Sequence, residues 1–355
     1  MESTKTINNK KRIGYIDSLR GFTMLLVVFA HVELFSFGIY SKDSLIGSIF
    51  ISFRMPMFFF ISGYIAYKLT NWNFSYYRQM LKKKAIVQLI PTLFFFFLFS
   101  ICQGKSFFSL ISDGPQGFWF TIVLFYMFVL YYTTMFLCQS FKSWASDAVL
   151  LVLSIIGAFT YIGGMKYYNL ESLPILCLTN LSRYFEFFVL GILCRKYNSN
   201  FLSFISNETV KVFLFLLFLF IFIIDWNESI IKFSYIHIFN HEFTIRYIGL
   251  LFVFSLFYNY KDYFDSESPI AHSLRFIGRR TLDIYLIHFF LIPNLDYCKS
   301  VILGNIKPQN TVVEFLTVFL ITITIIMICL LLSAIIRSSS FLGHYLLGAK
   351  LITKE

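Results

Sequence analysis

The sequence predicts an all-α integral membrane protein, with about ten transmembrane helices in one bundle and both termini in the cytoplasm. Of its 355 residues, 57% are hydrophobic, 14% are charged and 47 are phenylalanine, a composition that a water-soluble domain of this size does not tolerate. The apolar segments also lack the alternating strands of about ten residues that mark a membrane β-barrel. Both observations favour a helical bundle.

Each predicted span is an apolar segment suited to a hydrocarbon core about 30 Å thick, which takes roughly 20 helical residues to cross. The spans cover approximately residues 21–40, 45–69, 85–103, 117–138, 146–163, 173–194, 210–225, 243–260, 281–298 and 311–336. They use more than half of the chain, so we expect one membrane domain at 13–337. A polar cytoplasmic tail at 1–12 precedes it, and a cytoplasmic tail at 338–355 follows it.

The basic residues orient the bundle, because Lys and Arg are retained on the cytoplasmic side of membrane proteins. With the amino terminus inside, 19 of them fall in inside segments and six in outside segments, namely Lys42, Lys105, Lys166, Lys232, Lys299 and Lys307. This asymmetry predicts two cytoplasmic termini. It also explains most of the net charge of +11, because basic residues next to the membrane interact favourably with anionic lipid headgroups. No nucleic-acid partner is needed to account for this charge.

The first span carries ionisable residues in a helical register. Arg20 and His31 are eleven residues apart, almost three turns, so both side chains lie on one face about 16 Å apart along the axis. Asp17 shares this face, whereas Glu33 points away from it. Ionisable groups at this depth usually face a bundle interior or a watery cavity. Structural roles are the alternative. Arg20 would then extend to the membrane interface, and His31 would only form a hydrogen bond with a neighbouring helix. Asp17 and Arg20 would form an ion pair that anchors the end of the helix.

Five segments carry a resemblance: YIDSLRGFTMLLVVFAH (15–31), FRMPMFFFISGY (53–64), GFWFTIVLFY (117–126), SRYFEFFVLGILCRK (182–196) and IGRRTLDIYLIHFFLIP (277–293). In this order they resemble the membrane-bound acyltransferase 3 family, and within it the short branch of fucose 4-O-acetylase-like sugar acetyltransferases. The resemblance implies an enzyme of the bacterial cytoplasmic (inner) membrane. It implies transfer of an acyl group, commonly acetyl from the co-substrate acetyl-CoA, to a hydroxyl of a cell-surface glycan or its lipid-linked sugar precursor. No bound cofactor is expected.

The chemistry of alcohol acylation agrees with this implication. The attacking hydroxyl must lose a proton, and a histidine side chain, with an ordinary pKa of about 6.5, suits that task at neutral pH. We therefore expect His31 to be the general base. Arg20 is too far away to touch the same oxygen, so we place it on the path of the donor. There it holds CoA phosphates or orders the site through Asp17.

Basic residues also predict where the donor binds. The run Lys82, Lys83 and Lys84 flanks a span on the inner side, where an anionic donor arrives. Members of the family often have two basic residues a turn apart before the proline, but here Gln88 occupies the inner of those positions. Lys84 with Arg78 is the substitute we expect, and a simple positive-inside anchor is the alternative.

Further residues are second-tier candidates. Arg54, just before Pro56 in the second span, is expected to line the donor site, with a structural ion pair as the alternative. Trp119 is expected either to stack on the acceptor sugar or to belong to the interfacial aromatic belt. The remaining candidates are Arg183 with Glu186, which are also spaced for a structural pair, and Tyr285 and His288 of the TLDIYLIH segment, which are also candidates for packing.

No metal site is expected. His237 and His241 have the i, i+4 spacing of paired ligands, but no third ligand accompanies them, which favours a solvated outer loop. The six cysteines are scattered singly in or near spans and indicate small core residues.

Two other classes of function stay open at this stage. Buried arginines and histidines also occur in proton-coupled transporters and in flippases of sugar-containing substrates, although paired inverted repeats are not apparent here. A structural membrane partner is the third class. Consumption of acyl-CoA distinguishes the enzyme from both.

Overall fold

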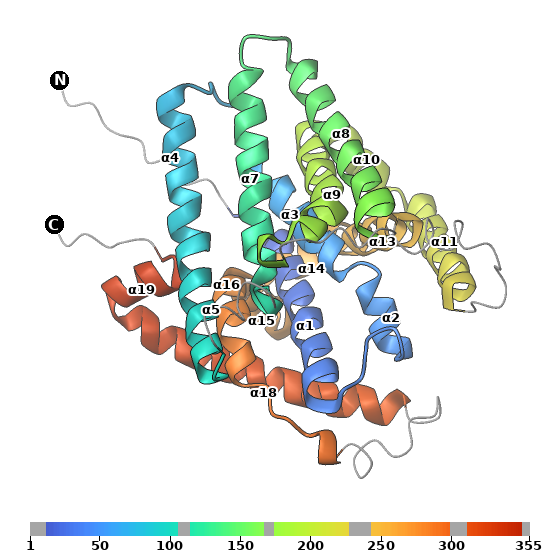
Figure 1. Ribbon diagram of the computed structural model, residues 1–355. Coiled ribbons are helices and arrows are strands. Elements are labelled where there is room, and N and C mark those ends of the chain that lie inside the picture. The colour runs from blue at the N-terminus through green and yellow to red at the C-terminus, as the bar shows by residue number, and fades with distance from the viewer. Residues whose placement is uncertain (1–11, 106–113, 167–173, 227–242, 299–310, 350–355) are drawn as a thin grey trace.

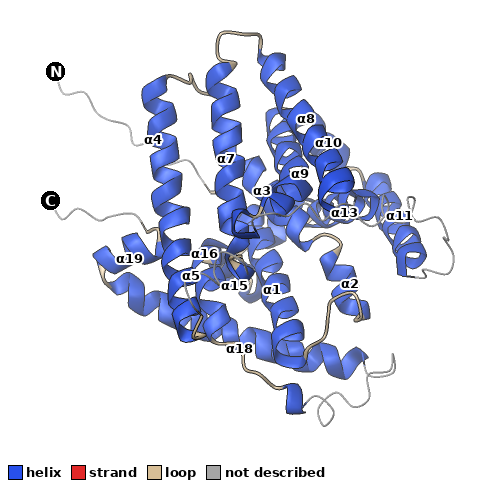
Figure 2. Ribbon diagram, viewed as in Figure 1, coloured by secondary structure: helices blue, strands red, loops and turns tan. Residues whose placement is uncertain are grey.

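The computed structural model describes residues 12–105, 114–166, 174–226, 243–298 and 311–349. Over these residues the regular secondary structure is entirely helical, and no β-strand occurs in them (Figure 2). The all-α prediction is therefore confirmed for this part of the chain.

The α-helices are α1 Gly14–Phe37, α2 Leu45–Ile51, α3 Arg54–Ala66, α4 Phe74–Lys84, α5 Ile90–Cys102, α7 Trp119–Leu137, α8 Ser143–Phe159, α9 Leu178–Lys196, α10 Asn198–Ser206, α11 Glu208–Trp226, α13 Ile245–Asn259, α14 Lys261–Asp265, α15 Pro269–Arg279, α16 Thr281–Ile287, α18 Thr311–Ser338 and α19 Ser340–Leu347. Two π-helical segments are η1 Ala85–Leu89 and η3 Thr160–Lys166. The 3-10 segments are η2 Gln116–Phe118, η4 Pro174–Leu176, η6 His288–Phe290 and η7 Asp296–Cys298. Figure 1 shows α4, α7 and α8 side by side, with α18 crossing beneath α1.

Seven helical stretches in the described part of the chain are long and apolar enough to cross a membrane. They are Gly14–Phe37, Leu45–Ala66, Phe74–Cys102, Trp119–Leu137, Ser143–Gly164, Pro174–Lys196 and Thr311–Ser338. A bent pair, Asn198–Ser206 with Glu208–Ile224, makes an eighth if it counts as one span. The chain is therefore a multi-pass membrane protein.

The three other predicted spans correspond to shorter or broken helices. The segment at 210–225 lies in the pair that bends by 75°, and the segments at 243–260 and 281–298 contain apolar helices of only 15 and 10 residues, Ile245–Asn259 and Thr281–Phe290. An apolar run in a sequence does not reveal where the helix within it breaks. The count of ten and the sides of the termini stay predictions.

Glycine allows two pairs of helices to cross at very short distance. A Cβ atom on Gly21 of α1 would meet the carbonyl oxygen of Leu274 at 2.0 Å, and one on Gly278 of α15 would meet that of Asp17 at 1.8 Å. In α3 and α9, Gly63 faces the Phe188 carbonyl in the same way. Small residues at helix contacts are a common device of membrane bundles, because lipid supplies little hydrophobic force between helices.

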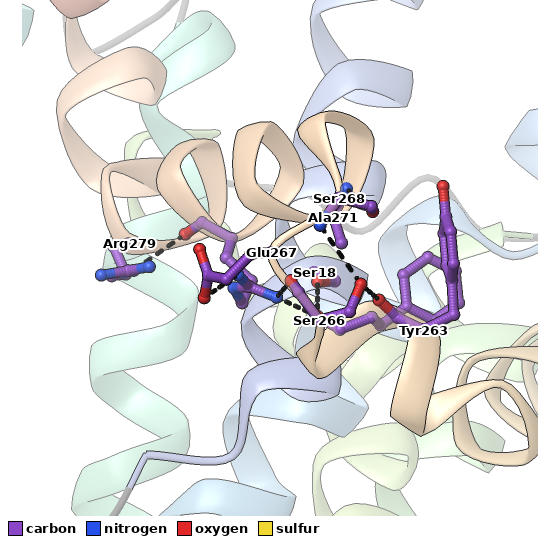
Figure 3. A network of polar contacts seen from close by, with 9 residues as sticks. Ser18, Tyr263, Ser266, Glu267, Ser268, Ala271 and Arg279 are labelled. Atoms are coloured by element: carbon purple, nitrogen blue, oxygen red, sulfur yellow. Dashed lines mark hydrogen bonds and ion pairs between the residues drawn. The ribbon is translucent and has the colours of Figure 1, made fainter.

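A polar network fixes the turn that leads into α15 (Figure 3). Buried Arg275 donates to the backbone carbonyls of Phe264 and Ser266, the latter at 2.6 Å, and Ser268 caps α15 by accepting from the Ala271 N–H. Ser18 of α1 also donates to the Phe264 carbonyl. The network attaches α15 to α1, the helix that carries Arg20 and His31.

A second network joins α16 to the last long helix. Arg337 of α18 makes a two-pronged contact with the buried Asp283 carboxylate, with Nε and Nη2 each 2.7 Å from an oxygen, and Ser333 donates to the same carboxylate. Arg337 also donates to the Leu347 carbonyl of α19, so the segment expected to be a tail contains a packed helix. A buried, bidentate pair of this kind fixes the position of α16.

Candidate active site

A cavity of about 510 Å³ lies among α1, α3, α4, η1, α7, α9, α13 and α16. On α1 its lining residues are Arg20, Met24, Val27 and His31, which recur every three or four residues and so form one face of the helix. Arg20 and His31 therefore face the same cavity, as their spacing predicts. Glu33 is fully buried and does not line it.

His31 contacts a second histidine at the wall of this cavity. Its Nδ1 lies 2.8 Å from Nε2 of His288, and the two rings are stacked, 5.0 Å between centres and 9° from parallel. His288 is fully buried behind His31, on η6 at the end of α16. The late TLDIYLIH segment and the first span thus meet at one point.

The hydrogen bonds of this pair determine where its protons lie. His288 Nδ1 is 2.9 Å from the carbonyl oxygen of Ile284, which can only accept, so Nδ1 carries the proton and Nε2 of a neutral His288 is an acceptor. His31 must then donate from Nδ1, which leaves its Nε2 as a lone pair. This arrangement gives the cavity a neutral imidazole that is ready to accept a proton.

Aromatic packing and one tyrosine hold the neighbourhood of the pair. Phe289 lies against both rings, with its centre 4.8 Å from that of His31 and 4.1 Å from that of His288. The Tyr285 hydroxyl donates to the Gly117 carbonyl at 2.7 Å and accepts from the Phe120 N–H at 3.1 Å. Tyr285 therefore attaches α16 to the start of α7, whose first residue is Trp119.

One end of the cavity, the Arg20 end, is defined by Arg20, Lys68, Lys83 and Lys84. Arg20 donates to the Thr281 hydroxyl at 2.8 Å, and its guanidinium lies 3.9 Å from Asp17. Lys84 is within electrostatic range of the other three cations, and its ammonium group sits 3.5 Å above the Phe128 ring. Four cations held this close together favour an anionic ligand.

The opposite end, the Arg54 end, is built around one tyrosine ring. The guanidinium carbons of Arg183 and Arg246 lie 5.5 Å and 5.7 Å from the centre of Tyr184, and Arg54 is within electrostatic range of the same residue. Trp119 stacks on Tyr184 with 5.8 Å between ring centres and 16° between planes. Arg54 also lies within electrostatic range of His31, so this end adjoins the histidine pair.

The lining as a whole is positively charged. It includes seven basic side chains, Arg20, Arg54, Lys68, Lys83, Lys84, Arg183 and Arg246, and no carboxylate among the described lining residues. Such a one-sided set of charges inside low-dielectric walls concentrates anions.

The predicted donor residues are separated by the fold. Lys84 and Arg54 line the cavity at different ends, whereas Arg78 is exposed on α4 and is not part of the lining. Gln88 lines it as well, from the π-helical turn η1, and its buried Oε1 has no hydrogen-bond partner among the residues that the structure describes. This turn lies just ahead of Pro91, whose missing N–H interrupts the regular ladder.

Two other predicted residues stand beside the cavity. Asp17 is buried next to Arg20 but is not part of the lining, as in the ion-pair alternative. The Glu186 carboxylate is hydrogen-bonded to the Tyr247 hydroxyl of α13.

Sequence reasoning missed many of the lining residues, among them Arg246, Tyr184, Lys68 and Thr281. Arg246 and Tyr184 are in predicted spans, and the depth of Arg246 in an apolar segment was a usable signal. Lys68 and Thr281 gave no signal, because their place in the site depends on how distant helices pack.

No group of three or more His, Cys, Asp and Glu suited to a metal occurs in the part of the chain that the structure describes. His237 and His241 lie outside the described residues.

The chain is a multi-pass helical bundle with a cation-lined cavity beside two hydrogen-bonded histidines. These features define the class of protein: it is an integral membrane protein with an internal, positively charged site. Comparison with protein families gives the next step. The Acyl_transf_3 family, described as an acyltransferase domain, matches residues 13–331, and the chain belongs to this family. The predicted family is thereby confirmed, and the protein is a membrane acyltransferase. The assignment to the short branch stays a prediction.

The chain has no significant match among curated proteins or among solved structures.

Proposed function

We propose that the protein is an O-acyltransferase that moves an acyl group, acetyl in the first instance, from acyl-CoA to a hydroxyl of a cell-surface saccharide or of its lipid-linked precursor. The observation that carries the proposal is the His31–His288 pair, which presents an imidazole lone pair at a positively charged cavity in a chain of an acyltransferase family.

The reaction follows from the state of the pair. His31 Nε2 accepts the hydroxyl proton while the hydroxyl oxygen bonds to the thioester carbonyl carbon. The resulting tetrahedral centre collapses, the C–S bond breaks, and the thiolate takes the proton back from His31. The products are an oxygen ester and free CoA. Arg54, within electrostatic range of His31, supplies positive charge for the oxyanion.

His288 orients the base throughout this reaction. Its Nε2 accepts from His31 Nδ1–H, which fixes the His31 tautomer and ring plane, and its own Nδ1–H is held by the Ile284 carbonyl. A third group that orients the base is a general feature of sites that activate hydroxyl groups.

The Arg20 end binds the CoA part of the donor. Arg20, Lys84 and their neighbours provide guanidinium and ammonium groups for phosphates, and Arg20 lies about 16 Å from His31 along α1, which leaves length for the linker between phosphates and thioester. We place this end on the cytoplasmic side of a bacterial inner membrane, with both termini inside and about ten spans. The Arg54 end then receives the acceptor.

Transport is the less favoured function. The family match supports acyl transfer, and no comparison favours a proton-coupled transporter or flippase.

The test is transfer of label. Purified protein in lipid nanodiscs is incubated with acetyl-CoA labelled in the acetyl group and with extracted cell-surface glycan. We expect label in the glycan, released as acetate by mild alkali because it is held as an ester. Label that stays with acetyl-CoA on every glycan fraction would contradict the proposal.

A further inference from the structure

We infer that Glu33 is a positioning residue for Arg54: through the hydroxyl group of Ser41, it holds the Arg54 guanidinium group at the wall of the cavity. The inference rests on the proposed function, in which Arg54 supplies positive charge for the oxyanion. Glu33 is fully buried and is not among the described residues that line the cavity, so it acts through Arg54 and does not touch the substrate.

A chain of two hydrogen bonds joins the two charged groups. Arg54 Nη1 donates to the Ser41 hydroxyl oxygen at 3.4 Å, and the Ser41 hydroxyl donates to Glu33 Oε2 at 3.5 Å. Both distances are long for hydrogen bonds, but a full charge at one end strengthens each of them. Glu33 and Arg54 also lie within electrostatic range of each other. Their attraction therefore favours the guanidinium position that the chain defines.

The loop between α1 and α2 fixes the middle of this chain. Ser48 of α2 donates to the Ser41 backbone carbonyl at 3.0 Å, and Ser44 is hydrogen-bonded to the Glu33 carboxylate. Gly47 allows the close approach, because a Cβ there would lie 3.0 Å from Glu33 Oε2 and 2.8 Å from the Ser41 Cα atom. The carboxylate and the hydroxyl that joins it to Arg54 are thus both held in place.

Arg54 depends on this anchor because little else holds its guanidinium group. Among the residues that the structure describes, Ser41 is its one hydrogen-bond partner. A guanidinium group has several N–H donors, so most of them stay available to the cavity that Arg54 lines. A charge that is already in place when the oxyanion forms stabilises it without the cost of reorganisation. Loss of the anchor lets the long side chain adopt other rotamers and weakens this stabilisation.

The energetic cost of a buried Glu33 argues against packing as its only role. A buried carboxylate destabilises a fold unless partners offset its desolvation, and Glu33 Oε1 has no hydrogen-bond partner in the described part of the chain. The buried acid Glu314 of α18 lies within electrostatic range of Glu33 and adds repulsion. An apolar side chain would pack here at less cost. Attraction to Arg54 is the interaction that an apolar side chain cannot supply.

The first test is the effect of Glu33→Gln on turnover of acetyl-CoA. The purified protein is assayed in nanodiscs with extracted cell-surface glycan as acceptor, and release of CoA is measured. Glu33→Gln keeps the size and an acceptor oxygen but removes the charge. We expect kcat to fall about 10- to 100-fold, with little change in the KM for acetyl-CoA, because the Arg20 end binds the donor.

A double-mutant cycle shows whether Glu33 acts through Arg54. Adding Glu33→Gln to Arg54→Gln should cause no further loss of kcat, because the group that Glu33 positions is already absent. Losses that multiply in the double variant overturn the inference. If Glu33→Gln does not fold, the same cycle is run with Ser41→Ala, which removes only the hydroxyl that joins the two charges.

Three single variants separate charge from packing. Glu33→Asp keeps the charge and should recover part of the lost kcat. Ser41→Ala should lower kcat by about 3- to 10-fold, since it removes one hydrogen-bonding group of the chain. Glu314→Gln is the matched control and should match wild type, because it removes a buried carboxylate that forms no hydrogen bond to Ser41 or Arg54 within the described residues. Equal losses of kcat in Glu33→Gln and Glu314→Gln overturn the inference.

A measurement without turnover separates this inference from the proposed function. In protein with isotope-labelled arginine, the NMR signal of the Arg54 guanidinium group is assigned by its absence in Arg54→Gln. We expect Glu33→Gln to shift this signal and to speed the exchange of its N–H protons with water. This change without acetyl transfer to any glycan would contradict the proposed function alone. Acetyl transfer with an Arg54 signal that is the same in wild type and Glu33→Gln would contradict this inference alone.

Discussion

At the residue scale, the site depends on proton positions that a single carbonyl determines. The Ile284 oxygen accepts a hydrogen bond from His288 Nδ1–H, so His288 Nε2 accepts from His31 Nδ1–H. The lone pair of His31 is therefore on its Nε2. The sequence predicts the shared face of Arg20 and His31, because eleven residues make three helical turns. It does not predict the contact with His288, because that contact joins residues 257 positions apart.

The role of His288 is testable by comparing two replacements. His288→Leu removes the acceptor for His31 Nδ1–H and lets the ring turn, so we expect kcat to fall about 100-fold. His288→Gln keeps an acceptor oxygen and should retain more activity. The KM for acetyl-CoA should change little in both variants, since His288 does not line the cavity. Equal losses in kcat for Leu and Gln would indicate a packing role only.

At the element scale, the cavity depends on helices that approach until their backbones touch. Gly21 with Gly278, and Gly63 with Gly191, allow α1 to cross α15 and α3 to cross α9. The apolar runs of the sequence predict where most helices lie, and the glycines within them are visible. Which glycines face a neighbouring helix is set by tertiary packing, as is the break between α10 and α11.

The α3–α9 contact can be tested with a single methyl group. In Gly191→Ala the new Cβ would meet the Phe60 carbonyl oxygen at 2.0 Å, and backbone atoms cannot move aside cheaply. We expect the variant to lose about 1–3 kcal/mol of stability, measured as a lower thermal unfolding temperature in detergent. Gly163→Ala is the matched control, because a Cβ added there would have no atom of the described part of the chain within 4 Å. Equal unfolding temperatures for the two variants would refute the close packing described here.

At the scale of the whole molecule, the bundle gathers two sets of cations around one cavity, and Arg54 of one set lies within electrostatic range of His31. Composition predicts a multi-pass helical protein, because so apolar a chain has no other stable environment. The gathering of Arg54, Arg183 and Arg246 at one end arises only from the packing of α3, α9 and α13. No pattern along the sequence predicts that these three arginines lie close together.

The most direct test of the central claim is the rate of CoA release from acetyl-CoA, with extracted cell-surface glycan as acceptor, in wild type, His31→Ala and His272→Ala. His272 is an exposed histidine of α15 outside the cavity and controls for loss of an imidazole. We predict that His31→Ala keeps its fold and releases CoA about 100- to 10,000-fold more slowly, while His272→Ala matches wild type. A folded His31→Ala that releases CoA as fast as wild type would show that His31 is not the general base.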